Sequence, residues 1–337
     1  MKVYLSLLLL LLPCLSLSAQ DLIFTTNKAK ANDTNQYTAE VRELDFIRKM
    51  KRNNAFSFQI DGELYVQEIK TVTHKNGYVS IAAISPDGKN VTSVLSEKSG
   101  KLGGIIQVNG QAYSVFKVDE DYQFEEIREK EFACDFDDNL FTIGGHQKSA
   151  DPGGTYANPT YDLSDYNDTT TVDVLLLYTT DAKNWADSVA YVTDIDHVIS
   201  INETNKELII ANSGLPLKIR FVEALEIANN SMTSASDILP SLRYNTYNNH
   251  VSAPDDTVDI ENMRNRYGAD LVALMEYFND GSGGIGYRIN SVGGTEGGGF
   301  TVNRVQQMYF TYTLMHEIGH NFGNAHGRTQ EVNEAGE

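Results

Sequence analysis

The feature that most constrains this chain is a stretch of eleven residues near its end, His316 to His326, which reads HEIGHNFGNAH. On an α-helix, residues four apart lie about 40° apart around the axis, so His316 and His320 project from one face and can bind one metal ion. Glu317 follows the first histidine, and a carboxylate there can accept a proton from a metal-bound water without being a ligand itself. A third ligand at His326 requires the chain to turn, and Gly323 permits that turn.

Three neutral imidazoles that leave a fourth position open are typical of a catalytic zinc site. Zinc lowers the pKa of a bound water toward neutrality, and Glu317 would take the proton as the water attacks a peptide carbonyl. The motif therefore predicts Zn²⁺ as cofactor, His316, His320 and His326 as metal ligands, and Glu317 as the catalytic base. Apolar residues interleave with the motif and indicate a buried helix: Tyr309, Phe310, Leu314, Met315, Ile318 and Phe322.

The pattern HExxHxxGxxH resembles the signature of the metzincin zinc endopeptidases. Within that clan the chain is most similar to the bacterial reprolysin-like, adamalysin-related branch, from Val172 to His326, through the segments TVDVLLLYT, INETNKELIIANSGL, RNRYGADLVALM and GIGY. The resemblance implies a zinc metalloendopeptidase, a hydrolase that acts on protein or peptide substrates. In the resembled family, a strand near residues 281–289 lies at the sheet edge above the zinc and binds the substrate backbone in extended form.

The elements expected in the second half of the chain alternate between strands and helices. Short apolar runs predict strands at residues 172–178, 217–227 and 270–275, and the remaining pattern predicts helices at 193–212, 236–243 and 257–267. This alternation predicts an α/β fold with a mostly parallel sheet. Together with the resemblance, it predicts a metzincin-like catalytic domain over residues 171–337, with a twisted sheet and a zinc helix.

The beginning of the chain predicts export. Met1 and Lys2 precede a mostly apolar run from Val3 to Leu12, and small residues follow up to Ala19. This pattern is typical of a secretory signal peptide, and it is too short for a membrane span of about 20 residues. We expect residues 1–19 to be a signal peptide and the protein to be secreted, with no membrane association after cleavage. A lipoprotein anchored through Cys14 is disfavoured by Pro13.

The charge of the chain argues against two classes of partner. Its formal net charge is -19 at pH 7. Nucleic acids and anionic membrane surfaces require cationic patches, so we expect neither as a partner. The oligomeric state stays open.

Residues 20–143 read as a separate β-rich unit. Short alternating stretches are separated by turn signals such as Asp61-Gly62, Asn76-Gly77, Asp87-Gly88 and Asn109-Gly110. This pattern predicts an antiparallel β unit built from hairpins. Because the unit lies between a signal peptide and a protease-like domain, we interpret it as a propeptide that aids folding and holds the enzyme latent. A freestanding β adhesion module is the alternative.

Cys134 lies at the end of this unit and is, with Cys14, one of two cysteines in the chain. A thiolate is a strong zinc ligand, so Cys134 could occupy the open fourth position as a zymogen switch, as the resemblance suggests. Asp135 or Asp137 could serve instead, and a small buried hydrophobic residue is the plain alternative. Residues 144–170 are rich in Gly, Pro, Asn, Asp and Ser, which indicates an exposed linker that contains the activation cleavage.

Two further interpretations stay open. In the resembled family a methionine turn lies beneath the zinc after the third histidine, and no methionine follows Met315. We therefore expect a C-terminally truncated catalytic domain, and a truncated relic would be a non-catalytic secreted zinc-binding or adhesion protein. A different zinc hydrolase clan would take its third ligand from Glu331, Glu334 or Glu337.

Overall fold

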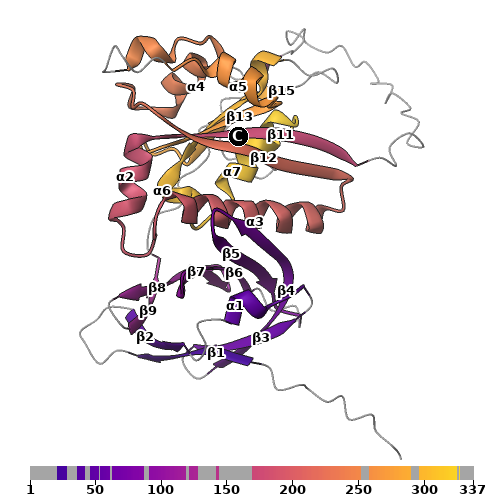
Figure 1. Cartoon of the computed structure of the whole chain (residues 1–337), viewed down its shortest axis with the longest axis vertical. Helices are drawn as coiled ribbons and strands as arrows, with labels where there is room; N and C mark the ends of the chain where they lie inside the picture. Colours follow the sequence, from indigo (N-terminus) through magenta and orange to yellow (C-terminus); the bar gives the residue numbers. More distant parts are fainter. Residues whose placement is uncertain are drawn as a thin grey trace, which may run out of the picture.

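The computed structural model describes residues 21–28, 36–41, 46–52, 54–60, 63–86, 91–118, 121–127, 142–143, 169–251, 258–289, 296–324 and 326. Two units follow each other along the chain, a β-barrel and an α/β unit (Figure 1). Within the described residues, no helix combines the length and the apolar composition that crossing a membrane requires.

The first unit is a closed barrel in which the strands follow the order β1-β2-β9-β8-β7-β6-β5-β4-β3. The parallel pairing of β1 with β3 closes the barrel, and the other pairings are antiparallel. Its strands are β1 Asp21–Lys28, β2 Gln36–Val41, β3 Ala55–Ile60, β4 Glu63–Lys75, β5 Tyr78–Ile84, β6 Val91–Lys98, β7 Lys101–Val108, β8 Gln111–Val118 and β9 Asp121–Glu126. A short helix, α1 Phe46–Lys49, brings Ile47 into a core of buried aromatic and aliphatic side chains.

The hairpins of the barrel form where the sequence predicts tight turns. Asn76 and Gly77 both have positive φ, 50° and 82°, and Asn109 and Gly110 have 52° and 86°. Two successive residues with positive φ are what a type I′ hairpin turn requires. The pairs at 61–62 and 87–88 lie outside the described residues.

The second unit is built on a five-stranded sheet with the order β12-β11-β13-β16-β14. The pairings of β12 with β11, β11 with β13 and β13 with β16 are parallel, whereas β14 pairs antiparallel with β16 at the edge. The strands are β11 Thr170–Thr179, β12 Leu217–Ile227, β13 Leu271–Glu276, β14 Gly284–Gly286 and β16 Phe300–Arg304. The three predicted strands thus correspond to β11, β12 and β13.

Helices cover both faces of this sheet. Successive residues of a strand point to opposite sides, so the apolar strands place side chains in two cores, one on each face. Val174 and Leu176 belong to the core under α2 Thr180–Ser188, α3 Ile195–Ser213, α6 Val305–Met308 and α7 Thr313–Asn321. Leu175 and Leu177 belong to the core under α4 Ala235–Arg243 and α5 Ile260–Tyr267. The remaining described elements are the strands β10 Thr142–Ile143 and β15 Arg288–Ile289 and the 3₁₀ helices η2 Tyr247–His250 and η3 Glu296–Gly298.

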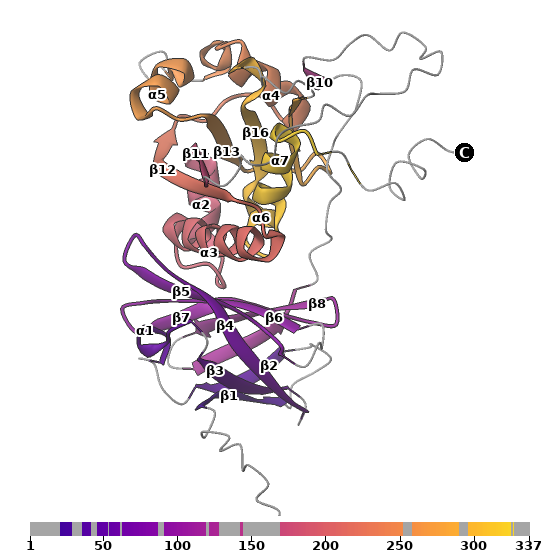
Figure 2. The ribbon, with the colours of Figure 1, turned by 90° about the vertical axis from the view of Figure 1, so that its right-hand side faces the viewer.

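The barrel packs against α3, as both views show (Figures 1 and 2). Three barrel residues, Ala82, Val94 and Ile105, belong to the same apolar core as the underside of the sheet. Buried hydroxyls also join the two units: Thr73 bonds Thr204 at 2.5 Å and Ser80 bonds Ser200 at 2.6 Å. The two units therefore share one packed interface along α3.

Candidate metal centre

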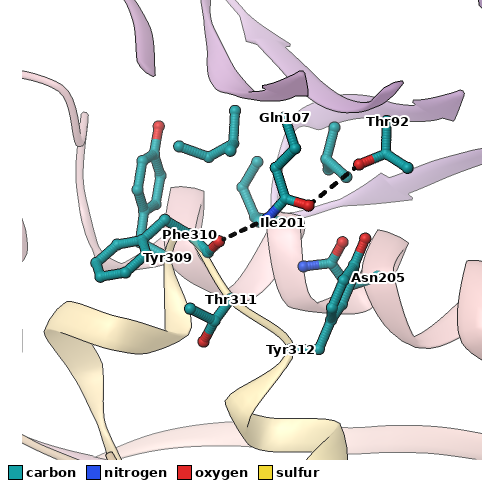
Figure 3. Close-up of a pocket in the computed structure, with 10 residues that line it drawn as sticks. Thr92, Gln107, Ile201, Asn205, Tyr309, Phe310, Thr311 and Tyr312 are labelled. Atoms are coloured by element: carbon teal, nitrogen blue, oxygen red, sulfur yellow. Dashed lines mark hydrogen bonds between the residues drawn. The ribbon is translucent and has the colours of Figure 1, made fainter. Parts of the chain in front are cut away.

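The helix that carries the histidine motif, α7, begins next to the barrel. Gln107 on β7 donates its side-chain amide to the carbonyl of Phe310 at 3.4 Å, just before the helix (Figure 3). A cavity of about 20 Å³ lies beside this contact, lined by residues of β6, β7, α3 and the segment that leads into α7. Such a space is large enough for one water. The barrel thus contacts the chain that leads into the motif.

The burial of α7 follows its apolar stripe. Leu314 and Ile318 are fully buried in the core beneath the sheet. Tyr309 and Phe310, counted from the sequence with the buried motif helix, are buried but precede α7, which starts at Thr313. Phe322, expected to be buried, is 40% exposed, because it is the residue at which the helix ends.

A glycine ends the helix and redirects the chain. Gly323 has φ +88°, in the left-handed region that favours glycine. Its N–H bonds the carbonyl of His320 at 2.8 Å, and the N–H of Asn324 bonds the carbonyl of Gly319 at 3.1 Å. These are the two hydrogen bonds of a Schellman motif. The predicted turn at Gly323 is present, and it brings His326 back toward the helix.

The three motif histidines come together at one point. One ligand nitrogen from each of His316, His320 and His326 lies within 4.8 Å of the others. The Nε2 atoms of His316 and His326 are 3.2 Å apart. Two nitrogens bound tetrahedrally to one zinc at about 2.0–2.1 Å would be roughly 3.3–3.4 Å apart, so the donor set fits a zinc ion.

Hydrogen bonding and burial prepare these imidazoles for a metal. The Nδ1 atom of His320 is 2.8 Å from the backbone carbonyl of Asn324, so Nδ1 carries the proton and Nε2 would be the atom that binds a metal. Partial burial, and then the neighbouring His320 and His326 rings, lowers the pKa of His316 to about 4. His316 is therefore neutral at pH 7, the form that binds a metal.

Glu317 is the buried neighbour of this cluster. Glu317 is only 1% exposed, although it lies in the sequence between His316 and His320 of the motif. Its side chain lies against the edge strand: a Cβ added to Gly284 would lie 2.9 Å from its Oε1. Among the described residues, the metal-ligand cluster consists of the three histidines without Glu317. This placement fits a base better than a ligand.

Asn321 is a structural residue of the site that the sequence reasoning missed. It is buried, and its side-chain amide lies 2.7 Å from the carbonyl of Tyr287, 3.0 Å from that of Gly298 and 3.3 Å from that of Phe300. These carbonyls come from the edge region of the sheet, so Asn321 joins the end of α7 to that edge. No spacing in the sequence signals such a contact.

A second buried group that the sequence did not signal is Glu276, at the end of β13. Its carboxylate accepts hydrogen bonds from Thr179 at 2.9 Å, from the backbone of Tyr277 at 3.1 Å and from Asn230 at 3.1 Å. Burial raises the pKa of Glu276 to about 7. The group joins the carboxyl ends of β11 and β13.

Several other residues singled out from the sequence lie outside the described part of the chain: Cys134, Asp135, Asp137, Glu331, Glu334 and Glu337. His197 is buried where α3 meets the barrel. It stacks on Tyr78 with ring centroids 5.2 Å apart and meets Tyr309 edge-on at 5.3 Å. His250 lies in η2 and is not part of the histidine cluster.

A helix that carries two of three clustered histidines next to a buried glutamate, packed against the edge of an α/β sheet, is the arrangement of a metallopeptidase. Residues 186–327 match the model of a protein family described as metallo-peptidase family M12B, reprolysin-like. The matched segment makes up less than half of the chain, and it confirms the resemblance to reprolysin-like metzincins that was read from the motif.

Solved structures with similarity to the chain include metalloproteinase-II from Bacteroides fragilis, at 14% identity and a TM-score of 0.42, covering 83% of this chain and 87% of that one. A structure titled as a chaperone-substrate complex matches at 16% identity and a TM-score of 0.37, covering 67% of this chain. The match spans 31% of the length of that second protein. A search among curated proteins found no match.

Proposed function

We propose that this protein is a secreted zinc endopeptidase that is made as a latent zymogen. The observation that carries the proposal is the meeting of His316, His320 and His326, whose ligand atoms all lie within 4.8 Å of one another. These three side chains would hold Zn²⁺. When bound, the ion would supply Lewis-acid activation of water and of a peptide carbonyl.

The protein's own groups supply the remaining chemistry. Glu317 acts as general base: it accepts a proton from the attacking water and then donates it to the leaving amine. Its burial keeps it close to where the proton is transferred and limits competing solvent. The edge strand β14 is the place where an extended peptide backbone would add to the sheet, and such main-chain pairing would tolerate many substrate sequences.

Latency is supported by a short pairing between the two halves of the chain. Thr142 and Ile143, which form β10, pair in parallel with Arg288 and Ile289 of β15. β15 lies beside the end of α7: a Cβ added to Gly323 would lie 2.9 Å from the carbonyl oxygen of Ile289. The segment at the end of the barrel unit therefore passes the edge of the metal centre. We assign residues 20–143 as the propeptide and residues 144–170 as the region cut on activation.

The central experiment measures zinc content and proteolysis on the full chain without its signal peptide, before and after cleavage in residues 144–170. We expect one zinc per chain, hydrolysis of an unstructured protein substrate after cleavage, and loss of that hydrolysis with a chelator. Glu317→Ala should keep the zinc and lose the hydrolysis. His250→Ala changes a histidine outside the cluster and should keep both. Zinc binding without hydrolysis in the cleaved protein would instead favour a non-catalytic binding protein.

A second experiment addresses the switch at the fourth position. If Cys134 holds the zymogen latent, Cys134→Ala should hydrolyse substrate without cleavage of the linker. Asp135→Ala and Asp137→Ala are the matched comparisons, because either carboxylate could serve instead. A Cys134→Ala protein that stays fully latent would assign latency to another group.

A further inference from the structure

The backbone conformation at Gly284 and Gly286 of the edge strand does not require glycine. Neither is among the residues with positive φ, so any residue could adopt their conformation. Glycine in the interior of a strand weakens it, since it loses more entropy on folding and has no side chain to pack. A reason other than backbone conformation must therefore explain both positions.

Glycine is needed at both positions because a side chain there would collide with Glu317. A Cβ added to Gly284 would lie 2.9 Å from Cγ and 2.9 Å from Oε1 of Glu317, and 3.1 Å from its Cδ. A Cβ added to Gly286 would lie 2.7 Å from the backbone oxygen of Glu317. Contacts under 3.0 Å require something to move. One glycine thus faces the side chain of Glu317 and the other faces its backbone.

The two glycines share one face of the strand because strand residues two apart point to the same side. Ile285, between them, points to the opposite side and is buried in the core under α4 and α5. The face with the glycines is thus pressed onto α7 at residue 317. We call Gly284 and Gly286 the glycine seat.

We propose that the glycine seat positions the Glu317 carboxylate for proton transfer, with Gly284 fixing how close the carboxylate comes to the edge strand. The catalytic part of this inference rests on the proposed function. The Glu317 side chain has no exposed side toward which it could relax, since the residue is 1% exposed. A methyl group at position 284 therefore pushes the carboxylate out of place.

The first test is a double-mutant cycle in thermal stability, which needs no catalytic activity. Gly284→Ala should lower the melting temperature by roughly 2–6 °C, because the added methyl group overpacks the contact. In a Glu317→Ala background the methyl group enters the space that the longer side chain leaves, so Gly284→Ala should cost nothing there. Equal losses in both backgrounds would overturn the inference.

A matched control adds the same methyl group one residue earlier. A Cβ on Gly283 would meet the side-chain amide of Gln307, the nearest atom at 2.5 Å, and none of its nearest contacts is Glu317. Gly283→Ala should therefore change the melting temperature equally in the presence and absence of the Glu317 side chain.

The second test separates positioning from packing. In the cleaved enzyme, Gly284→Ala should lower kcat about 100-fold, the cost of misplacing a catalytic group by about 1 Å, with KM and the zinc content unchanged. Gly268→Ala, at the end of α5 where an added Cβ meets nothing within 4 Å, should keep the kcat of the unmodified enzyme. An unchanged kcat in Gly284→Ala would overturn the positioning role. If the unmodified protein hydrolyses nothing, the proposed function fails, and the stability cycle alone decides whether Gly284 sets the position of Glu317.

Discussion

At the scale of single residues, the site depends most on His326, the proposed zinc ligand that lies beyond the end of α7. It reaches the other two histidines only because the chain turns at Gly323. We expect His326→Ala to lose stoichiometric zinc, measured by elemental analysis after gel filtration, while the protein stays folded. Retention of one zinc per chain would point instead to a third ligand at Glu331, Glu334 or Glu337.

Single residues of the site differ in whether the sequence alone could predict their contacts. The meeting of the three histidines was predictable because it depends on spacing along one helix and one turn. Asn321 was not, since its three backbone partners come from the distant segments around Tyr287, Gly298 and Phe300. The glycine seat was missed for the same reason: the contact of Gly284 with Glu317 joins two segments that the sequence does not show to be neighbours.

At the scale of elements, the end of α7 is the critical point. Gly323→Ala combines two costs: a left-handed backbone that costs a non-glycine residue about 1–2 kcal/mol, and a Cβ 2.9 Å from the carbonyl oxygen of Ile289. We expect a loss in the free energy of unfolding beyond the backbone cost alone, together with weaker zinc binding. Chemical denaturation and metal titration measure the two effects.

Gly268 offers the matched control, because it ends α5 with φ +61° and an added Cβ there meets nothing within 4 Å. Gly268→Ala should show the backbone cost of about 1–2 kcal/mol alone and leave zinc binding unchanged. Equal effects of the two substitutions on zinc affinity would contradict a specific role of the Gly323 turn.

The elements themselves were predictable to different degrees. The helix at α3 has an N-cap at Asp194 and a left-handed Gly214 at its end, signals that the sequence displays locally. In the barrel, Ser and Thr interrupt the apolar pattern of β6, so its sequence gives only a weak local strand signal. β2 lies in a polar run, and its place depends on pairing with β1 and with β9, which is far along the chain.

At the scale of the whole molecule, the interface between barrel and α3 contains a titratable group. Burial, chiefly, lowers the pKa of His197 to about 4, while nearby Asp194 opposes this shift and Lys98 adds to it. The ring lies between Tyr78 and Tyr309, and its Nε2 has no hydrogen-bond partner. Protonation of His197 thus disfavours the docked barrel.

The sign of the pH effect follows from these values. Between about pH 6.5 and pH 4 the unfolded chain binds a proton at residue 197 that the folded chain does not, so stability is lost on acidification, by up to about 3 kcal/mol. Glu276, with its raised pKa, acts in the opposite direction between about pH 4.5 and pH 7. The difference between the unmodified protein and His197→Phe isolates the histidine.

We expect the free energy of unfolding of the unmodified protein to fall relative to that of His197→Phe as the pH decreases from 6.5 to 4. Urea denaturation at several pH values measures this difference. Parallel plots of the free energy of unfolding against pH for the two proteins would show that folding does not lower the pKa of His197, and they would contradict this account.

The central claim is that three histidines hold one zinc ion in a reprolysin-like site. X-ray absorption at the zinc edge of the purified, zinc-loaded protein tests it most directly, because it reports the kind and number of ligand atoms. The account predicts one zinc per chain with three nitrogen ligands at about 2.0–2.1 Å, reduced to two nitrogens or to no bound zinc in His326→Ala. A protein that binds no zinc, or a spectrum that is the same with and without His326, would contradict it.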